Sequence, residues 1–348
     1  IDTVDSQKAE EFFHNLQETG VSKIDYLVAN HAEGDHAGLC QMVLDKFPGC
    51  KIICNNQCKG LLQSHYKIEE GHFQVIKDGD TLSLGDKSLE FIFAPWVHWP
   101  ETMLTYLREQ QILFTCDLFG THLASSDLFP GSSDSEAAHI LEETKLYYAQ
   151  IMMPFRTHIQ KHMERISKYP LKMIAPSHGP IFNRPEVVLN AYRDWVSDRV
   201  KNEVVIPYIS MYGSTEKLVM ELTDQLEKNK VTVRPMNLAT SDMGQVAKAL
   251  VDPATIVIGS SMVLNGPHPT VSYALMLANL LKPKARYGAV LGSFGWGGKL
   301  SEQIVALIPN LKLEMLDGAI CKGHPLPQDL KKIEALAQAI TQRHQNLG

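Results

Sequence analysis

The stretch Asn30-His-Ala-Glu-Gly-Asp-His-Ala-Gly38 is the most informative part of the amino-terminal half, because it places four metal-ligand side chains directly after a short apolar segment. These side chains are His31, Glu33, Asp35 and His36. The preceding residues 24–29 (Ile-Asp-Tyr-Leu-Val-Ala) have the composition of a buried strand. We therefore predict a strand over 24–29 whose carboxyl end carries a loop of metal ligands.

Three later ligand candidates repeat this arrangement. They and the apolar segments before them are His98 after 89–97, Asp117 after 112–116 and His178 after 173–177. We expect the four strand ends to converge, so that the seven side chains form a binuclear metal site. Asp117 is the expected bridge, because it stands alone between the histidines and one carboxylate can hold two cations roughly 3.5–4 Å apart.

The ligand types narrow the choice of metal. Imidazoles and carboxylates without a thiolate favour iron or manganese over the closed zinc sites that stabilise folds. The competing interpretation is that each histidine is an ordinary surface or core residue. We adopt that interpretation for the other histidines of the chain, which has 14 in all, but not for this cluster.

The second half opens with a different kind of motif. An apolar segment at 204–209 runs into the hydroxyl-rich loop 210–217, which begins a helix. Gly213 allows a phosphate to approach the backbone, and the unpaired N–H groups of the helix start favour an anion. Leu218, Leu222 and Leu226 mark the buried face of that helix.

Two further strand and loop pairs support this interpretation. The segment 254–260 runs into loop 261–269, and 287–293 runs into loop 294–299. In a doubly wound sheet of strand order 2-1-3-4-5, these loops meet where a flavin mononucleotide (FMN) binds. Trp296 is a candidate wall for the flavin ring, and the alternative is an ordinary core aromatic. The candidate FMN contacts are Ser210, Met211, Tyr212, Gly213, Ser214, Thr215, Ser261, Met262, Val263, Leu264, Asn265, Ser293, Phe294, Gly295, Trp296, Gly297 and Gly298.

Composition agrees with two α/β domains, which we place at 1–200 and 201–348. The 348 residues are 44% hydrophobic and 21% charged, enough to bury two cores. The net charge of −6 argues against nucleic acid as a partner. No apolar run is long enough for a bilayer and no secretion signal opens the chain, so we expect a cytoplasmic protein without a membrane partner. The six scattered cysteines are expected to be buried free thiols.

The ligand pattern resembles that of the flavodiiron proteins, also called A-type flavoproteins. Zinc hydrolases with the metallo-β-lactamase fold usually carry a histidine where this chain has Glu33, and a carboxylate at that position suits iron. The surrounding sequence is also similar to the family at His98-Trp-Pro-Glu-Thr-Met103, Tyr147-Tyr148, Met153-Pro-Phe155 and Ser293-Phe-Gly-Trp-Gly-Gly298.

The resemblance implies a metallo-β-lactamase-like αββα sandwich followed by a flavodoxin-like doubly wound parallel sheet. It also implies a division of the metal ligands. One iron would take His31, Glu33 and His98, the second would take Asp35, His36 and His178, and Asp117 would bridge them. His36 is the least secure ligand, because water replaces this histidine in some family members. Tyr148, with Tyr147 and Trp99, is a candidate for lining the gas pocket, and a packing role for each is an equal alternative.

The implied activity is reduction of O2 to water, of NO to N2O, or of both. The catalytic set would be His31, Glu33, Asp35, His98, Asp117, His178 and Tyr148. Electrons would pass through FMN from rubredoxin or F420H2. The donor is expected to be external, because the chain holds no C-x-x-C pair. The family also implies a head-to-tail homodimer, with a tetramer left open, and neither the donor nor the preferred gas is readable from the sequence.

Two other functions and one departure from the family stay open at this point. The chain could be a zinc hydrolase with an FMN-binding appendage, against which Glu33 and the flavin loops count. It could also be a non-catalytic electron carrier, although no metal ligand is missing. The chain begins at Ile1-Asp-Thr-Val-Asp5, where family members already have their opening strands, so we expect those strands to be absent from this sequence.

Overall fold

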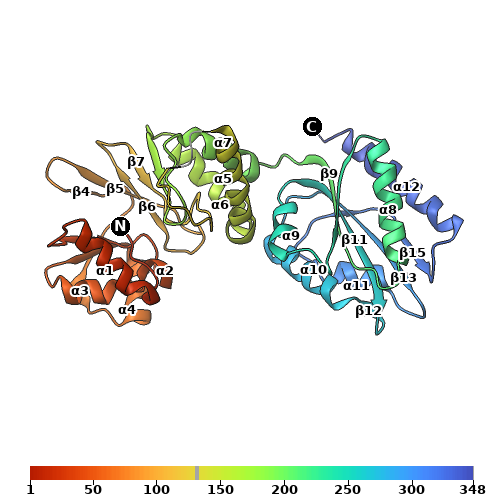
Figure 1. Cartoon of the computed structure of the whole chain (residues 1–348), viewed down its shortest axis with the longest axis horizontal. Helices are drawn as coiled ribbons and strands as arrows, with labels where there is room; N and C mark the ends of the chain where they lie inside the picture. Colours follow the sequence, from red (N-terminus) through yellow and green to blue (C-terminus); the bar gives the residue numbers. More distant parts are fainter. Residues whose placement is uncertain (130–132, 348) are drawn as a thin grey trace. The chain divides into compact units, whose positions relative to one another are not determined.

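The computed structural model describes residues 1–129 and 133–347 and divides the chain into two compact units (Figure 1). The first unit comprises Ile1–Tyr147 and Phe155–Val196. The second comprises Tyr148–Pro154 and Ser197–Gly348. The main division therefore falls between Val196 and Ser197, and the short segment Tyr148–Pro154 groups with the second unit.

The first unit is built on two sheets. One is parallel, with strand order β1-β2-β3, and the other has the order β4-β5-β6-β7-β8, antiparallel except for the last pair. The strands are β1 (Tyr26–Val28), β2 (Lys51–Cys54), β3 (Phe73–Val75), β4 (Thr81–Ser83), β5 (Ser88–Phe93), β6 (Met103–Leu107), β7 (Ile112–Phe114) and β8 (Met173–Ala175). The helices are α1 (Ala9–Glu18), α2 (Gly34–Ala37), α3 (Cys40–Lys46), α4 (Asn56–Tyr66), α5 (Asp134–Tyr147), α6 (Arg156–Ile166) and α7 (Pro185–Val196).

Alternating side chains of the parallel sheet explain how the layers stack. In β1 and β2, Leu27 and Ile52 pack in a core with residues of α1, α3 and α4. The next residues, Val28 and Ile53, point to the opposite face and pack against side chains of β5 and β6. One face of this sheet is thus covered by helices and the other by the second sheet. This is the αββα sandwich of the metallo-β-lactamase fold.

The strands that lead to the ligand loops are shorter than predicted. The segment 89–97 was expected to be one strand, but β5 ends at Phe93 and residues 94–98 form a connection to β6. Pro95 explains the early end, because proline has no N–H to donate to a neighbouring strand. The predicted strands 112–116 and 173–177 likewise end at Phe114 and Ala175.

The second unit contains one parallel sheet of order β10-β9-β11-β13, completed by β14 and β15, both of which pair with β13. This is the 2-1-3-4-5 order of a flavodoxin-like fold and confirms the prediction. The elements are β9 (Lys201–Tyr208), α8 (Ser214–Lys228), β10 (Thr232–Asn237), α9 (Met243–Ala249), β11 (Pro253–Val263), β12 (Gly266–Pro267), α10 (Pro269–Leu281), β13 (Tyr287–Phe294), α11 (Leu300–Ala306), β14 (Glu314–Met315), β15 (Ala319–Lys322) and α12 (Pro327–His344).

Helices cover both faces of this sheet. Val257 of β11 joins a core with α8 and α12 that includes the predicted Leu218, Leu222 and Leu226. Its neighbour Ile256 faces the other side, where residues of α9 and α10 surround it. The predicted loop 261–269 is partly ordered as a hairpin, because β11 continues to Val263 and pairs with β12. None of the helices in the described residues is long and apolar enough to cross a membrane.

Candidate metal centre and phosphate-binding loops

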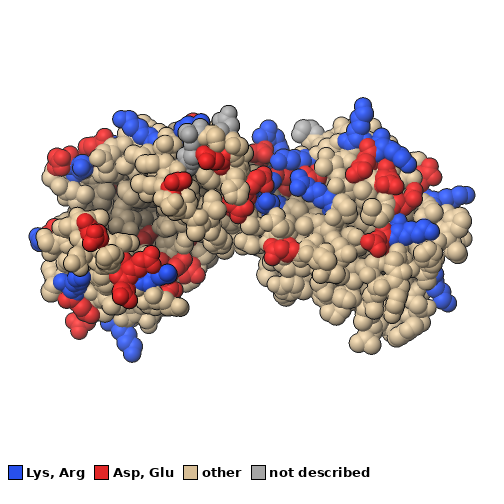
Figure 2. All heavy atoms as spheres, viewed as in Figure 1, with Lys and Arg blue, Asp and Glu red and all other residues tan. Residues whose placement is uncertain are grey.

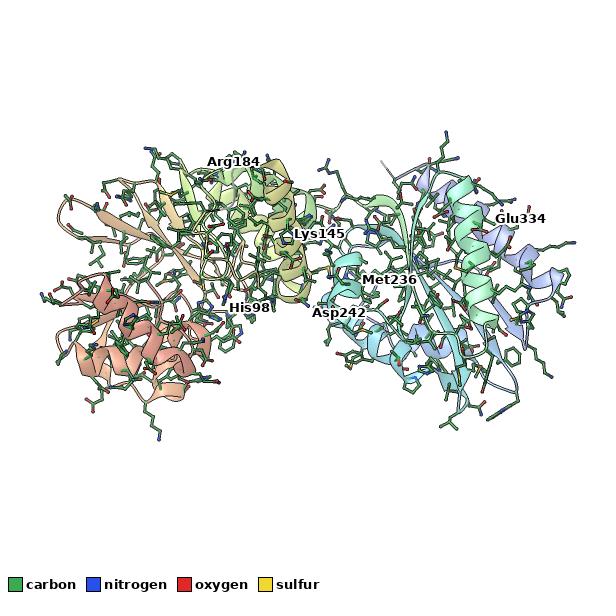
Figure 3. The ribbon with its side chains drawn as sticks, in the orientation of Figure 1. His98, Lys145, Arg184, Met236, Asp242 and Glu334 are labelled. Atoms are coloured by element: carbon green, nitrogen blue, oxygen red, sulfur yellow. The ribbon has the colours of Figure 1, made fainter. Side chains whose placement is uncertain are left out.

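The structure brings all seven predicted metal ligands together in the first unit. The loop after β1 carries His31 and Glu33, and the one-turn helix α2 carries Asp35 and His36. His98, labelled in Figure 3, comes from the connection between β5 and β6. Asp117 and His178 follow the carboxyl ends of β7 and β8, which are parallel neighbours, so their ligands leave the sheet at the same edge.

Three of the ligands form one half of the cluster. Glu33 Oε2 lies 3.1 Å from His31 Nε2 and 3.3 Å from His98 Nε2. Asp117 Oδ2 faces the same two nitrogens, at 3.9 Å and 3.7 Å. Within the described residues, His31, Glu33 and His98 can offer three ligand atoms that all lie within 4.8 Å of one another.

The other half uses the remaining oxygen of Asp117. Asp117 Oδ1 lies 3.2 Å from both His36 Nε2 and His178 Nε2. Asp35 Oδ2 lies 3.3 Å from His178 Nε2 and 3.7 Å from His36 Nε2. The two carboxylate oxygens of Asp117 therefore face two separate ligand sets, which is the arrangement a bridging ligand requires.

The ligand side chains differ in how far they are exposed to solvent. The side chains of His31, His36 and Asp117 are at most 2% exposed. Those of Glu33 and Asp35 are about two-fifths exposed, at 42% and 43%. A small molecule can thus reach the carboxylates of Glu33 and Asp35, whereas the Asp117 carboxylate is shielded from water.

The electrostatics of the cluster favour cations. Burial works to lower the pKa of His31, but hydrogen bonds with Glu101 and Glu33 outweigh it and raise the pKa to about 9. His178 behaves in the same way: burial opposes the charge, yet Asp117 and Asp35 raise its pKa to about 9. Burial opposes the charged form of Asp117 as well, but His178 and His36 hold its pKa well below the ordinary range.

These shifts test whether a metal pair fits the residues present. The three carboxylates carry more negative charge than the rest of the metal-free cluster can balance. The pKa values of His31 and His178 are therefore raised, and these imidazoles hold protons. Two divalent cations would displace those protons and satisfy the converging nitrogens and oxygens. The donor set is nitrogen and oxygen only, which suits iron or manganese. The residues therefore fit a dinuclear site.

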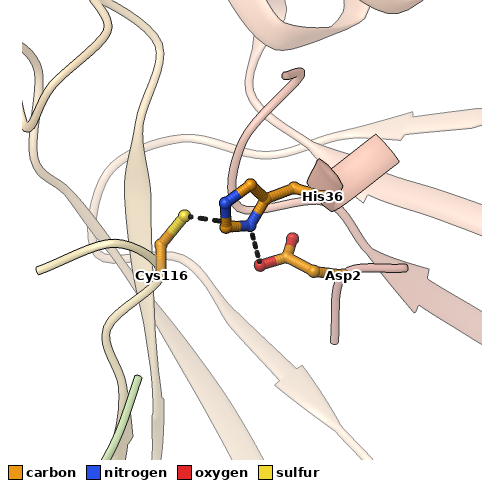
Figure 4. Close-up of side chains that lie close together, drawn as sticks. All are labelled: Asp2, His36 and Cys116. Carbon is orange, nitrogen blue, oxygen red and sulfur yellow. Dashed lines mark hydrogen bonds and ion pairs between the residues drawn. The ribbon is translucent and has the colours of Figure 1, made fainter. Parts of the chain in front are cut away.

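Several contacts around the ligands were missed by sequence reasoning. Glu101 accepts a hydrogen bond from His31 Nδ1 at 2.8 Å, and Asp2 lies 3.4 Å from His36 Nδ1 (Figure 4). Tyr147 donates a hydrogen bond to Asp117 Oδ1 at 2.8 Å. Glu101 stood inside the family-like segment 98–103, and its signal was a carboxylate close in sequence to a ligand histidine.

The aromatic candidates differ in where they lie. The ring of Trp99 meets that of His31 edge-on at a centroid distance of 4.9 Å, and Tyr147 lies 5.9 Å from His178. Tyr148 is fully buried in the segment that groups with the second unit, and its catalytic role stays a prediction. His122, which we had treated as an ordinary histidine, lies 4.7 Å from Tyr147 by ring centroid.

In the second unit, the three predicted loops meet at the carboxyl ends of the strands. Ser261 Oγ accepts a hydrogen bond from Met211 N at 3.2 Å, which joins the first loop to the second. The hydroxyls of Thr215 and Ser293 lie 3.1 Å apart and join the first loop to the third. The loops thus form one surface, as the strand order requires.

Two glycines allow the second and third loops to pack closely. Gly298 has φ +104°, and a Cβ there would meet Met262 Cε at 1.8 Å. Gly297 has φ +59°, and a Cβ there would meet Asn265 Oδ1 at 3.0 Å. The hairpin that carries Asn265 turns at Leu264 and Asn265, both with positive φ (49° and 65°).

The surface of these loops fits a flavin phosphate and a flat ring. Gly213, with φ +78°, caps the 15-residue helix α8, and a Cβ there would meet nothing within 4 Å. Glu216 N already donates to Ser210 Oγ at 3.1 Å, so an anion at this helix start would use the N–H groups of Ser214 and Thr215. Trp296 is 67% exposed, so its alternative interpretation as a core aromatic is wrong. The surface around β12 and α11 also carries few charged side chains (Figure 2).

Comparisons with known proteins agree with this geometry. Residues 1–179 match the model of the ODP family beta lactamase. The chain is 35% identical to a nitric oxide reductase of Moorella thermoacetica over 349 residues, which cover 99% of this chain and 87% of that protein.

Solved structures extend the similarity to both units. The rubredoxin oxygen:oxidoreductase of Desulfovibrio gigas is 27% identical with a TM-score of 0.94, covering 99% of this chain and 88% of that one. The flavodiiron protein of Giardia intestinalis is 26% identical with a TM-score of 0.90, covering 99% and 86%. With both ligand half-sites and all three flavin loops in place, the chain belongs to the flavodiiron protein family.

Proposed function

We propose that this oxidoreductase reduces O2, NO or both at a non-haem iron pair held by residues 1–200, with electrons delivered through FMN bound by residues 201–348. The single observation that carries the proposal is the position of Asp117. Its two oxygens face two separate sets of nitrogen and oxygen ligands, one of which contains Glu33. A mononuclear site has no need of such a divided carboxylate.

Each ligand has a defined part in this proposal. His31, Glu33 and His98 would hold one iron, Asp35, His36 and His178 would hold the other, and Asp117 would supply one carboxylate oxygen to each set. When bound, the iron pair supplies electrons and open coordination positions for a small diatomic molecule. Tyr147 holds a proton at its hydroxyl, because burial and Asp117 raise its pKa well above the ordinary value. Its hydrogen bond to Asp117 Oδ1 orients that carboxylate.

The flavin loops have a separate part. The N–H groups at the start of α8 and the hydroxyl of Ser214 would bind the FMN phosphate, and Ser210 and Thr215 would shape the loop through hydrogen bonds with Glu216 N and Ser293 Oγ. Residues of the hairpin around Asn265 and of the loop Ser293 to Gly298 contact the ring. The exposed Trp296 gives the ring an aromatic surface to stack on. The side chains of Met211, Tyr212 and Leu264 are also exposed and would add apolar surface beside the ring.

The partners follow from the chemistry. Reduction of O2 to water consumes four electrons, and reduction of two NO to N2O consumes two, so an external donor must reload the flavin. Rubredoxin and F420H2 are the two donor classes we propose. A head-to-tail homodimer, with or without further assembly into a tetramer, would bring FMN and iron of different chains together. We also propose a cytoplasmic location, since all six cysteines are free and buried, as predicted.

Anaerobic stopped-flow of the reduced protein against O2 and NO separately tests this function. The expected result is rapid reoxidation of FMN by at least one gas, with water or N2O as the product. Protein that contains FMN and two iron ions per chain but is reoxidised by neither gas would contradict the proposal. Two zinc ions and no iron would instead indicate a hydrolase.

A further inference from the structure

Two buried carboxylates outside the predicted ligand set contact ligand histidines on the ring nitrogen that faces away from the cluster. His31 Nδ1 donates to Glu101 Oε1 at 2.8 Å, while His31 Nε2 faces Glu33 and Asp117. His36 Nδ1 lies 3.4 Å from Asp2 Oδ2, while His36 Nε2 faces Asp117. An acceptor at Nδ1 fixes both the tautomer and the ring orientation of a metal-binding histidine.

The contact to His31 is short and well supported. The side chains of His31 and Glu101 are both fully buried, at 0% exposed. Glu101 Oε1 also accepts from Ala32 N at 3.2 Å, and Asn55 Nδ2 donates to the backbone oxygen of Glu101 at 2.5 Å. The other carboxylate oxygen, Oε2, is buried without a hydrogen-bond partner among the described residues. The hydrogen bonds of this side chain are thus concentrated on His31 and the residue next to it.

The contact to His36 is longer and shared. Asp2 Oδ2 also accepts from Ser177 Oγ at 3.3 Å, and Asp2 Oδ1 accepts from Asn30 N at 2.7 Å. Cys116 Sγ lies 3.6 Å from the same His36 Nδ1 (Figure 4). It also lies 3.4 Å from Asp117 Oδ2. Two groups therefore compete for one nitrogen, and neither makes a short hydrogen bond to it.

The backbone keeps Asp2 beside His36 despite the loose side-chain contact. Thr3 N donates to His36 O at 2.6 Å, and Asp2 N donates to Val28 O at 2.7 Å. Gly38 lets this segment approach, because a Cβ there would meet Ser6 N at 2.9 Å and Val4 O at 3.0 Å. The backbone therefore fixes the position of Asp2, and only its side-chain contact to the His36 ring is long.

We propose that Glu101 and Asp2 are positioning residues that hold the two iron half-sites unequally. Glu101 keeps His31 as a permanent ligand of one iron. Asp2 and Cys116 hold His36 as an exchangeable ligand of the other, so the half-site of Asp35, His36 and His178 releases its metal first. The inference rests on the proposed iron pair and states which half-site loses its metal first.

Iron release from the FMN- and iron-loaded protein to a ferrous chelator tests this directly. The wild type should lose iron in two phases, one ion per phase. Asp2→Ala should accelerate the fast phase about 10–100-fold and leave the slow phase unchanged. Asp2→Asn, which keeps an acceptor oxygen, should restore part of the difference. Glu101→Gln should accelerate the slow phase.

Two matched substitutions control for the loss of a carboxylate. Asp5→Asn removes a helix-capping carboxylate from the same segment as Asp2, and Glu109→Gln removes an exposed carboxylate that accepts two hydrogen bonds from Ser88. Both should release iron as the wild type does. The EPR spectrum of the one-electron-reduced pair adds a readout that a purely structural role leaves unmoved, and both Asp2→Asn and Glu101→Gln should change it.

The outcomes separate this inference from the proposed function. If the wild type holds two irons and consumes gas, but the Asp2 and Glu101 variants match it in release rates and spectrum, the inference alone is wrong. Acceleration of both phases equally by either variant also overturns it, as does a third metal ion at Asp2, His36 and Cys116. If the wild type holds no iron pair, the proposed function itself fails.

Discussion

The candidate site of the first unit is formed by ionisable side chains, whereas that of the second unit is formed mainly by backbone and loops. The first unit buries ionisable side chains, so its site is a set of opposed charges that a pair of cations completes. The second unit uses strand order, glycines and a helix start, and leaves apolar side chains such as Trp296 and Leu264 exposed. A charged site depends on each ligand atom, whereas a backbone site depends on how closely the loops approach one another.

The largest expected effect is on the charged site. Asp117→Ala removes both oxygens that face the two half-sites, so we expect the protein to lose both irons. The rate of gas reduction should fall at least about 100-fold, because one ligand is lost from each half-site. FMN should stay bound at the wild-type ratio, because its loops belong to the other unit. Iron and FMN per chain, measured on the same sample, check this. Full iron retention would show that Asp117 is not the bridge.

The reciprocal experiment changes the backbone site. Gly298→Ala places a Cβ against the end of the Met262 side chain on a residue with φ +104°, so the Met262 side chain must move and the loop backbone is strained. We expect FMN affinity to fall at least about tenfold, a cost near 1.4 kcal/mol, with iron content unchanged. Gly295→Ala is the matched control, because a Cβ there meets nothing within 4 Å. Fluorescence titration of apoprotein with FMN gives both values, and equal affinities for the two variants would contradict the loop contact.

Most residues of the candidate metal centre could be predicted from the sequence, because metal ligands are recognised by residue type and by their positions after apolar segments. Glu101 and Asp2 were not predicted, and Tyr147 was predicted only as a residue of the gas pocket. Their contacts to the ligands join residues 30 to 70 positions apart. The strand order of the second unit was predicted correctly. The hairpin after β11 was missed, although Asn265-Gly266 is a turn signal that we did not use.

The pH dependence of stability should also differ between the units. In metal-free protein, the pKa values of His31 and His178 are raised to about 9. Protonation of the two imidazoles therefore stabilises the fold fully below pH 6.5, and this contribution is lost as pH rises to about 9. Each shift corresponds to roughly 3 kcal/mol at most. Iron replaces the protons, so the loaded protein should lose this dependence. Thermal melting of both forms from pH 6 to 9 tests it, and parallel curves would contradict it.

The second unit should show a smaller effect in the opposite direction. His344 is buried between Thr255 and Asn202, and burial lowers its pKa to about 4. The neutral ring accepts from Thr255, which a protonated ring cannot do. Stability of this unit should therefore fall as pH drops from 6.5 towards 4, with a single group contributing. Hydrogen exchange of β9 and β11 amides reports it, and the loss should be absent in His344→Gln.

The proposed bridge between two iron ions at Asp117 can be tested by elemental analysis of the purified protein, with FMN quantified on the same sample. We predict two irons and one FMN per chain, and loss of both irons but not of FMN in Asp117→Ala. Two zinc ions per chain without iron, or an Asp117→Ala protein that keeps both irons, would contradict it.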